Sequence, residues 1–452
     1  MIDIGTAGTK RRTKDGAHVY SAAGAVDWNE RWPKTPPPLA EVYGEEVAKL
    51  VANKPEVPHA EQAWEHWRKL GSPRFHVAPM VDQSELAFRM LCRKYGCDSA
   101  YTPMIHSRLF VEDKNYQDEI FETTGDGADR PLWIQFCAND PELFVTAARK
   151  IQQHGDYIDL NLGCPQRIAR RGNYGAFLMD DIPAACAVVR KGATELDTPM
   201  SVKIRVFDDV ARTIDYARQL EAAGAMLLCV HGRTREQKAI GSFPADWDQI
   251  RAVREALSIP VLANGNVDSY EAALQCMDYT GCEGVLSAEQ LLEDPKLFWR
   301  REGDPSTKRV AAEAPRMLRE YLELLREYPQ PIRMVKAHIF KLLGAWLQEH
   351  FDLMAVVTQR GLAPLDELID MTHELERRIV ACGREYPIPA VNHDALEKRK
   401  QKAARKRAMY EQRREARLEA GDKLKRKAEQ DEDDAGEEQG MVGGHKDKVQ
   451  HV

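Results

Sequence analysis

Short apolar runs alternate with longer amphipathic stretches between residues 72 and 303. Amphipathic patterns such as Pro141–His154, Val210–Ala223 and Asp246–Ala256 separate most of the runs. Strands that alternate with helices imply βαβ units and parallel pairing. Eight units predict a (β/α)8 TIM barrel over residues 72–303, with a doubly wound sheet as the alternative. The predicted strands are Phe75–Ala78, Ser99–Thr102, Leu132–Phe136, Tyr157–Leu160, Ser201–Ile204, Met226–Val230, Val261–Ala263 and Gly284–Leu286.

The strand rhythm stops after the barrel. Residues 304–390 predict a small all-helical domain, with helices at Arg316–Glu327 and Ile332–His350. The second helix has an apolar stripe, and Arg333, Lys336 and Lys341 lie largely off it. This pattern indicates one basic face, and an ordinary solvated helix surface is the alternative.

Polar extensions flank these two domains. Residues 1–71 are proline-rich in part and predict a flexible N-terminal extension, in which Glu61–Leu70 could form a short helix that packs Trp64 and Trp67 on the barrel. Residues 391–452 form a charged tail. Within it Ala395–Lys427 holds 14 basic against 5 acidic residues, and Glu429–Glu438 holds 7 acidic residues. Such a tail predicts disorder or an exposed helix, with nucleic-acid contact or nuclear import as further options.

Composition narrows the class of protein. A hydrophobic content of 43% is enough for a sizeable core. The nine cysteines lack CxxC pairs, which argues against a disulfide framework or a zinc site and favours a reducing compartment. We therefore expect a protein of the cytoplasm, the nucleus or both, without a metal. We also expect a monomer. The first residues lack an apolar signal region, and no apolar run is long enough to span a membrane.

Polar and reactive residues follow nearly every predicted strand. In TIM barrels the active site lies at the carboxyl ends of the strands, so these residues are candidates for one site. They are Ala78-Pro79-Met80 and Asp82, Gln135, Asn161 and Cys164, Lys203 and Arg205, His231 to Arg235, Asn264-Gly265-Asn266, and Ser287-Ala288. A lone histidine or Asn-Gly pair is usually structural. A lysine in a buried strand, however, needs a partner.

The residue types in this set suit a flavin. Asn264-Gly265-Asn266 and Ser287 lie where barrels often bind phosphate. Lys203 places a cation deep in the mouth, and Gln135 offers both a donor and an acceptor. These groups could hold a phosphate, a ring carbonyl and an imide edge.

Cys164 opens a basic segment at the fourth strand. Arg167, Arg170 and Arg171 follow it in a predicted loop. A thiol beside positive charge indicates chemistry on an anionic polymer. The alternative is a buried structural cysteine next to a solvated basic loop.

The combination of these motifs resembles the tRNA dihydrouridine synthases from about Phe75 to Trp299. The motifs are Ala78-Pro79-Met80, Gln135-Phe136-Cys137-Ala138-Asn139, Asn161-Leu162-Gly163-Cys164-Pro165, Lys203-Ile204-Arg205, His231-Gly232-Arg233-Thr234 and Asn264-Gly265-Asn266. The segment Gly163 to Leu178 is similar to the eukaryotic branch that modifies tRNA D-loop uridines 16 and 17. The resemblance implies an FMN-binding barrel, NADPH or NADH as reductant, and a helical tRNA-binding domain.

The resemblance also implies roles for single residues. Reduced flavin would give hydride to C6 of a uridine, and Cys164 would protonate C5. The uridine would have to leave its stack to reach the flavin. Cofactor-binding residues would be Ala78, Pro79, Met80, Gln135, Lys203, His231, Asn264, Gly265, Asn266, Ser287 and Ala288. Substrate-binding residues would be Asn161, Arg205, Arg233, Arg333 and Lys336. Ser287-Ala288-Glu289 departs from the family, in which many members have Gly-Arg.

Two other functions remain open at this point. One is an FMN barrel dehydrogenase that acts on a free pyrimidine. The other is a tRNA-binding protein with an idle barrel. The arginine-rich segment, the helical domain and the basic tail favour polymeric RNA over a free base, and Cys164 together with Lys203 argues against an idle barrel.

Overall fold

The computed structural model describes residues 32–238, 243–299, 313–384 and 412. Its centre is a closed parallel barrel, in which eight strands pair in a ring and β2 closes the ring onto β4. The predicted TIM barrel is therefore confirmed. The eight strands are β1 Phe75–Val77, β2 Ser99–Tyr101, β4 Leu132–Cys137, β5 Tyr157–Leu162, β6 Met200–Arg205, β7 Leu227–His231, β8 Val261–Asn264 and β9 Gly284–Ser287.

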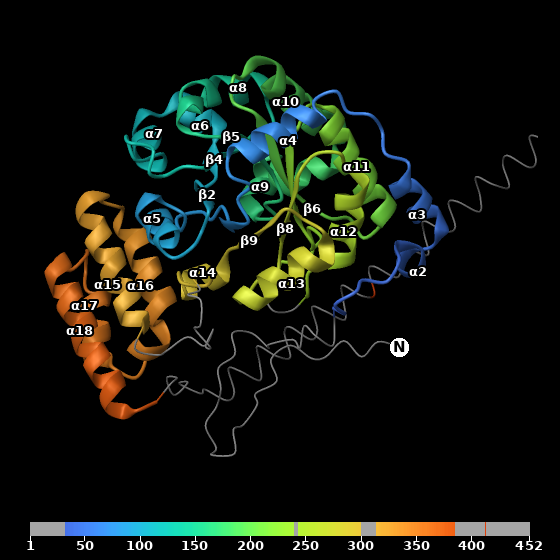
Figure 1. The fold of residues 1–452 in the computed structure, drawn as a ribbon. Helices are drawn as coiled ribbons and strands as arrows, with labels where there is room; N and C mark the ends of the chain where they lie inside the picture. Colours follow the sequence, from blue (N-terminus) through green and yellow to red (C-terminus); the bar gives the residue numbers. More distant parts are fainter. Residues whose placement is uncertain (1–31, 239–242, 300–312, 385–411, 413–452) are drawn as a thin grey trace, which may run out of the picture. The chain divides into compact units, whose positions relative to one another are not determined.

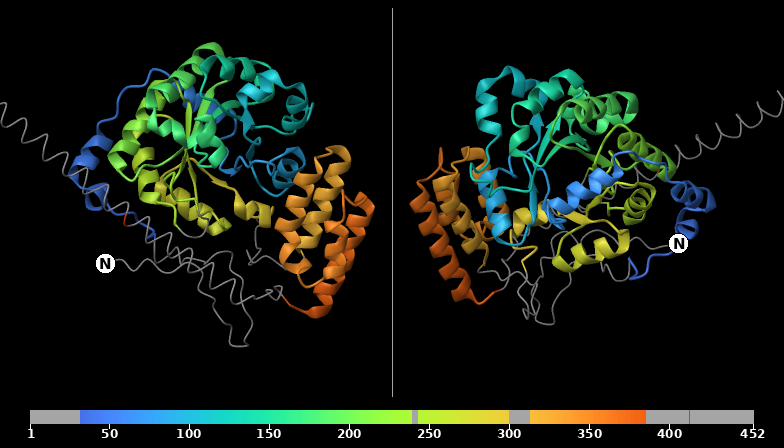
Figure 2. Two further views of the ribbon diagram at one scale, coloured as in Figure 1. Left: turned by 180° about the vertical axis from the view of Figure 1, so that it is seen from behind. Right: turned by 45° about the horizontal axis from the view of Figure 1, so that its top comes forward.

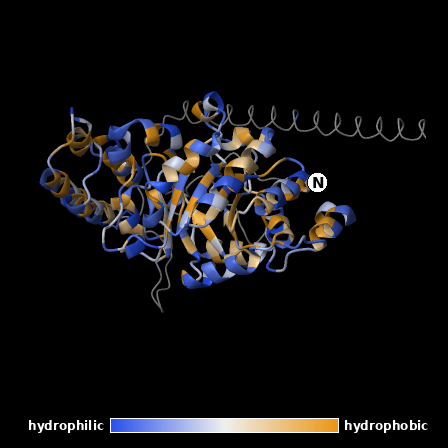
Figure 3. Ribbon diagram, turned by 90° about the horizontal axis from the view of Figure 1, so that it is seen from above, coloured by the Kyte–Doolittle hydropathy of each residue, from blue (hydrophilic) through white to orange (hydrophobic). Residues whose placement is uncertain are grey.

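Strands and helices form two concentric layers. Figure 1 shows the strands surrounded by helices, and in Figure 3 hydrophobic colour lies on strands and on parts of the helices. Every residue of β4, β5 and β6 is buried. Strands buried on both faces read as near-continuous apolar runs, which is why the sequence identified them. A ninth strand, β3 Ile105–His106, pairs with the end of β4 and was not predicted.

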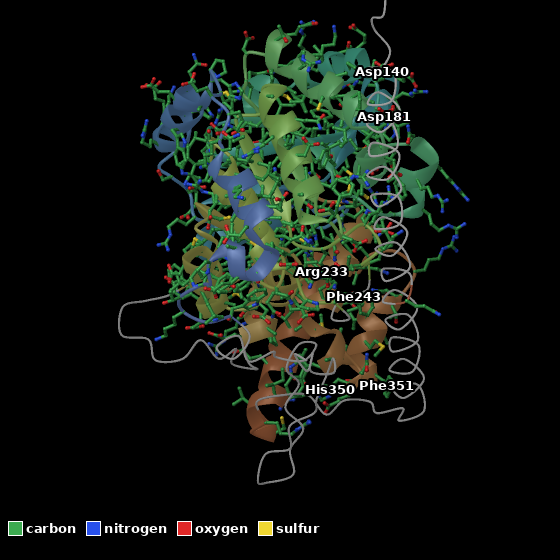
Figure 4. All side chains as sticks on the ribbon, turned by 90° about the vertical axis from the view of Figure 1, so that its right-hand side faces the viewer. Asp140, Asp181, Arg233, Phe243, His350 and Phe351 are labelled. Carbon is green, nitrogen blue, oxygen red and sulfur yellow. The ribbon has the colours of Figure 1, made fainter. Side chains whose placement is uncertain are left out.

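Several helices around the barrel begin at side-chain caps. The carboxylate of Asp140 accepts from the N–H groups of Glu142 at 2.9 Å and Leu143 at 3.0 Å, and Asp181 caps α10 in the same way (Figure 4). The predicted helix Pro141–His154 ends early and continues as a 3-10 turn, Gln152–His154. The helices are α5 Leu86–Lys94, α6 Ser107–Glu112, α7 Lys114–Ile120, α8 Pro141–Arg149, α9 Arg167–Gly172, α10 Ile182–Glu195, α11 Val210–Ala222, α12 Trp247–Ala256, α13 Tyr270–Thr280 and α14 Glu289–Glu293.

The segment before the barrel differs from the predicted flexible extension. Residues 32–71 contain α2 Leu39–Tyr43, α3 Glu45–Ala52 and α4 Ala60–Lys69. Val47 and Val51 pack against Val210 and Ile214 of α11, and the Trp32 ring stacks on another tryptophan of the barrel. The prediction of flexibility is wrong for these residues, because apolar side chains spaced along short helices bury themselves on the outer helices of the barrel.

Helix α4 covers the end of the barrel at which the strands begin (Figure 2). The Trp67 ring is buried with Trp133 and Tyr157 from inside the barrel. The indole N–H of Trp64 donates to the carbonyl of Ser258 at 2.8 Å. The expected short helix and its packing tryptophans are confirmed.

Within residues 313–384, four helices follow the barrel. They are α15 Glu313–Glu327, α16 Ile332–Leu347, α17 Phe351–Thr358 and α18 Leu365–Cys382. Glu85, next to α5, accepts hydrogen bonds from the Tyr321 hydroxyl at 2.8 Å and from His338 Nε2 at 3.0 Å. These buried contacts join the helices to the barrel.

Some predictions fall on other parts of the chain. Residues 1–31 of the extension and the charged tail, apart from Gln412, lie outside the described residues. No helix in the described residues combines the length and the apolar character that a membrane span requires.

Candidate active site

The predicted site residues meet at the carboxyl ends of the barrel strands. Strand register places Asn161 beside Lys203, Arg205 beside His231, and His231 beside Asn264. The strand-end residues from β1 to β9 therefore share one mouth, as the sequence predicted. Their roles in binding stay predictions.

Three side chains form a buried hydrogen-bonded chain in this mouth. The carboxylate of Asp159 accepts from Gln135 Nε2 at 2.8 Å. Gln135 Oε1 in turn accepts from Asn161 Nδ2 at 2.8 Å. Asn161 Oδ1 then accepts from the backbone N–H groups of Gly163 at 3.1 Å and Cys164 at 2.8 Å. The chain links the barrel interior to the cysteine.

Sequence reasoning missed Asp159. Its carboxylate is fully buried and also accepts from the Ser201 hydroxyl at 2.7 Å. Burial raises the pKa of Asp159 to about 6, although hydrogen bonds and the Lys203 charge oppose the rise. A signal was present, since Asp159 lies two residues before Asn161 and so points to the same side of the strand.

Lys203 reaches across the mouth to β8. Its ammonium donates to Asn264 Oδ1 at 2.9 Å, and Asn264 Nδ2 donates to the carbonyl of Leu286 at 3.0 Å. Burial lowers the pKa of Lys203, and the Asp159 carboxylate acts in the opposite direction. The lysine thus has a polar partner, and a carboxylate close enough to influence its charge.

Cys164 is half-buried at the mouth. Burial raises the pKa of its thiol, against the influence of the Gln166 backbone and the Arg205 charge. Its carbonyl accepts from the N–H of Ala176 at 3.1 Å. Gly175 allows this contact: it has φ of +63°, and a Cβ there would lie 2.8 Å from the Cys164 carbonyl oxygen.

Arg205 closes the same loop from β6. Its Nε donates to the carbonyl of Gly163 at 2.8 Å, and its Nη1 donates to the carbonyl of Thr234 at 3.0 Å. The arginine predicted to bind substrate therefore also holds the loops after β5 and β7 together.

Arg233 lies with residues assigned to the cofactor phosphate. Its guanidinium contacts His231 Nε2 at 3.0 Å and donates to Asn266 Oδ1 at 2.9 Å and to the Phe243 carbonyl at 2.7 Å (Figure 4). Burial and the neighbouring arginines hold the pKa of His231 well below its usual value, so the imidazole is neutral. Gly265 and Asn266 have positive φ of 115° and 60°.

The turn after β9 uses its hydroxyl internally. Ser287 Oγ donates to the carbonyl of Val267 at 2.7 Å, so its proton is already engaged within the protein. Any anion contact predicted for Ser287 and Ala288 would then depend on backbone N–H groups.

The predicted basic face of the helical domain is already engaged. Arg333 pairs with Asp82 at 3.2 Å and also with Glu119, and Lys336 donates to the carbonyl of Gln359 at 2.9 Å. Lys341 pairs with Glu289 at 2.7 Å. RNA phosphates would have to compete with these partners.

The arginines after Cys164 behave differently. The predicted loop is in fact the short helix α9, and its Ala169 is buried against Cys137 and Tyr174. Arg167, Arg170 and Arg171 are exposed. Within the described parts of the chain none of the three forms an ion pair. Beside the thiol, α9 is therefore a surface of uncompensated positive charge.

Residues 76–360 match the sequence profile of a family described as "Dihydrouridine synthase (Dus)". The chain is 45% identical over 315 residues to a Mus musculus protein named "tRNA-dihydrouridine(16/17) synthase [NAD(P)(+)]-like", which covers 69% of this chain and 64% of the mouse protein.

Two yeast proteins named "tRNA-dihydrouridine(16/17) synthase [NAD(P)(+)]" are also similar. The Schizosaccharomyces pombe protein is 40% identical over 328 residues, which is 70% of this chain and 81% of the relative. The Saccharomyces cerevisiae protein is 37% identical over 334 residues, which is 72% of this chain and 78% of the relative.

Proposed function

The chain belongs to the dihydrouridine synthase family, and on this basis we propose that it reduces uridines 16 and 17 of tRNA to dihydrouridine. One observation carries the proposal: the half-buried Cys164 lies at the barrel mouth, with its backbone held by Asn161. The names of the relatives support tRNA positions 16 and 17, and the residues of the site support the reduction of uridine.

The donor set at the mouth fits FMN. Gly265 has the positive φ and tight surroundings of a backbone cradle, since a Cβ there would lie 2.7 Å from Ala245 Cβ. Arg233 and the neutral His231 would hold the phosphate end, while Lys203 and Gln135 would hold the ring edge. When bound, FMN supplies the hydride after reduction by NADPH or NADH.

Cys164 supplies the proton in this proposal. Burial raises the pKa of the thiol, so the group is protonated at neutral pH and can act as an acid. Asn161 and Arg205 hold its loop through the Cys164 N–H and the Gly163 carbonyl. The thiol is thereby positioned before the uracil arrives.

We propose that α9 is the main RNA contact near the site. Phosphates would meet Arg167, Arg170 and Arg171 without displacing a described carboxylate. The predicted contacts of Arg333 and Lys336 are proposed as secondary ones, because each side chain already has a partner.

Mapping of dihydrouridine in tRNA tests the function. Purified protein with FMN and NADPH is incubated with tRNA from cells that lack this protein. Dihydrouridine should form at positions 16 and 17 and not at 20a or 20b. Reduction of free uracil but not tRNA would favour a pyrimidine dehydrogenase, and binding without reduction would favour the idle barrel.

A further inference from the structure

We propose that Asp159 is a positioning residue, which sets the orientation of the Gln135 and Asn161 amides and thereby the placement of Cys164. The inference rests on the proposed function only for its effect on turnover. Asp159 is fully buried, and it lies on β5 two residues before Asn161, on the same side of the strand.

The first step fixes Gln135. An ionised carboxylate can only accept hydrogen bonds, so the amide facing it must present its NH2 group. Gln135 Nε2 lies 2.8 Å from Asp159 Oδ2. Gln135 Oε1 is consequently turned toward Asn161.

The second step fixes Asn161. Because Gln135 presents an oxygen, Asn161 must donate through Nδ2, at 2.8 Å. Asn161 Oδ1 is left to accept both N–H groups of the loop, at 3.1 Å for Gly163 and 2.8 Å for Cys164. In the flipped orientation the Asn161 NH2 group would face two N–H donors, and both contacts would be lost.

The carboxylate is itself held in place. Ser201 Oγ donates to Asp159 Oδ1 at 2.7 Å, on the oxygen that Gln135 does not use. The charge of the nearby Lys203 favours the ionised form. One buried charge therefore gives direction to a chain of hydrogen bonds that ends at the catalytic loop.

Alkylation of Cys164 by iodoacetamide tests the placement without tRNA. The reaction is followed by peptide mass in the holoprotein, with the exposed Cys382 as internal reference. An asparagine here can present either a donor or an acceptor to Gln135. Asp159→Asn therefore no longer fixes which atom of the Gln135 amide faces Asn161. It should raise the Cys164 rate by about tenfold, as loss of one hydrogen bond would. Ser201→Ala, the matched control, leaves Gln135 paired and should change the rate by less than about twofold.

A double-mutant comparison distinguishes an effect of Asp159 through Asn161 from a non-specific loss of rigidity around Cys164. If Asp159 acts through Asn161, then Asp159→Asn should add nothing in an Asn161→Ala background. An unchanged rate in Asp159→Asn, an equal effect of Ser201→Ala, or additive effects would overturn the proposal. If Asp159→Asn does not fold, Gln135→Met interrupts the same chain and should raise the Cys164 rate equally.

Turnover provides the functional readout. Asp159→Asn should reduce tRNA about 10–100-fold more slowly per bound flavin at saturating tRNA, because the acid is misplaced. If the wild type reduces no tRNA, the proposed function fails while the alkylation experiment still decides the role of Asp159.

Discussion

The ammonium of Lys203 donates a 2.9 Å hydrogen bond to the side-chain oxygen of Asn264, across the mouth of the barrel. The two residues lie on strands β6 and β8, which are separated by β7. The contact ties the end assigned to the flavin ring to the segment assigned to its phosphate.

Replacement of Lys203 by Met should therefore yield largely apo protein. The change removes the cation and leaves Asn264 Oδ1 without its donor, so FMN affinity should fall by at least about tenfold. Flavin absorbance per protein measures the effect. Lys191→Met, which removes a surface ion-paired lysine, is the control and should keep full flavin. Full flavin in Lys203→Met would refute its assigned role.

Cys164→Ala should separate the two half-reactions. Without the thiol proton, tRNA reduction should fall about 10²–10⁴-fold, while FMN content and NADPH oxidation persist. Single-turnover dihydrouridine formation is the measurement, and Cys382→Ser, at an exposed cysteine, is the control. Near-normal dihydrouridine formation in Cys164→Ala would exclude the thiol as the acid.

The pH dependence of this step should reflect the raised pKa of Cys164. Burial favours the neutral thiol, so the proton donor should remain intact above the ordinary thiol pKa of 9.0. Single-turnover rates of pre-reduced enzyme should show no loss from thiol ionisation between pH 7 and pH 9. A decline centred below pH 8 that disappears in Cys164→Ser would contradict this expectation.

Charge reversal on α9 should weaken tRNA binding. Arg170→Glu with Arg171→Glu removes two potential phosphate contacts, which should lower affinity about tenfold or more at moderate salt. It should also reduce the slope of log K against log salt by about 1.5. FMN content should be unchanged.

A matched double reversal at Arg149 and Arg190, on α8 and α10, controls for net charge. Reversal of Arg333 and Lys336 tests the predicted helical-domain contact in the same assay. A larger effect there than on α9 would reverse the proposed ranking.

Glu85→Gln should destabilise the joint between barrel and helices. Burial opposes ionisation of Glu85, but His338 and Tyr321 outweigh it and hold its pKa below the usual value of 4.5. Because the pKa is lower in the folded state, the ionised carboxylate stabilises the fold at pH values above its unfolded-state pKa. This stabilisation is lost as the pH falls through the folded-state pKa. Urea unfolding at pH 7 should show a loss of about 1–3 kcal/mol, shrinking below about pH 4.5. Glu327→Gln, at an exposed carboxylate, should change little.

The barrel was predictable because its strands are buried on both faces. In runs such as Leu132–Cys137 every residue is buried, so the run is not interrupted by alternating solvent-exposed positions. Helix α9 was not predictable in the same way: Arg167 to Gly172 bury only Ala169, and a single apolar residue leaves no periodic stripe. Helices α2 and α3 were not predicted for a related reason, since the prolines around them indicated a linker.

The site was predictable where chemistry and strand ends coincide, as at Cys164 and Lys203. Asp159 was missed because only residues at the carboxyl ends of strands were considered, and Asp159 lies in the middle of β5. The partners of Arg333 were missed because Asp82 and Glu119 lie far from it in the chain. Such long-range compensation of charge is visible only after folding.

The cover formed by α4 has a consequence for synthesis of the chain. Trp64 bonds to Ser258, which is 194 residues later in the sequence. At about 5–20 residues per second, the ribosome exposes the α4 tryptophans for about 10–40 s before that partner emerges. Charged residues flank them on both sides, with Glu61 before Trp64 and Arg68 after Trp67. Charges of this kind oppose aggregation, so they protect a nascent segment whose binding surface has not yet been translated.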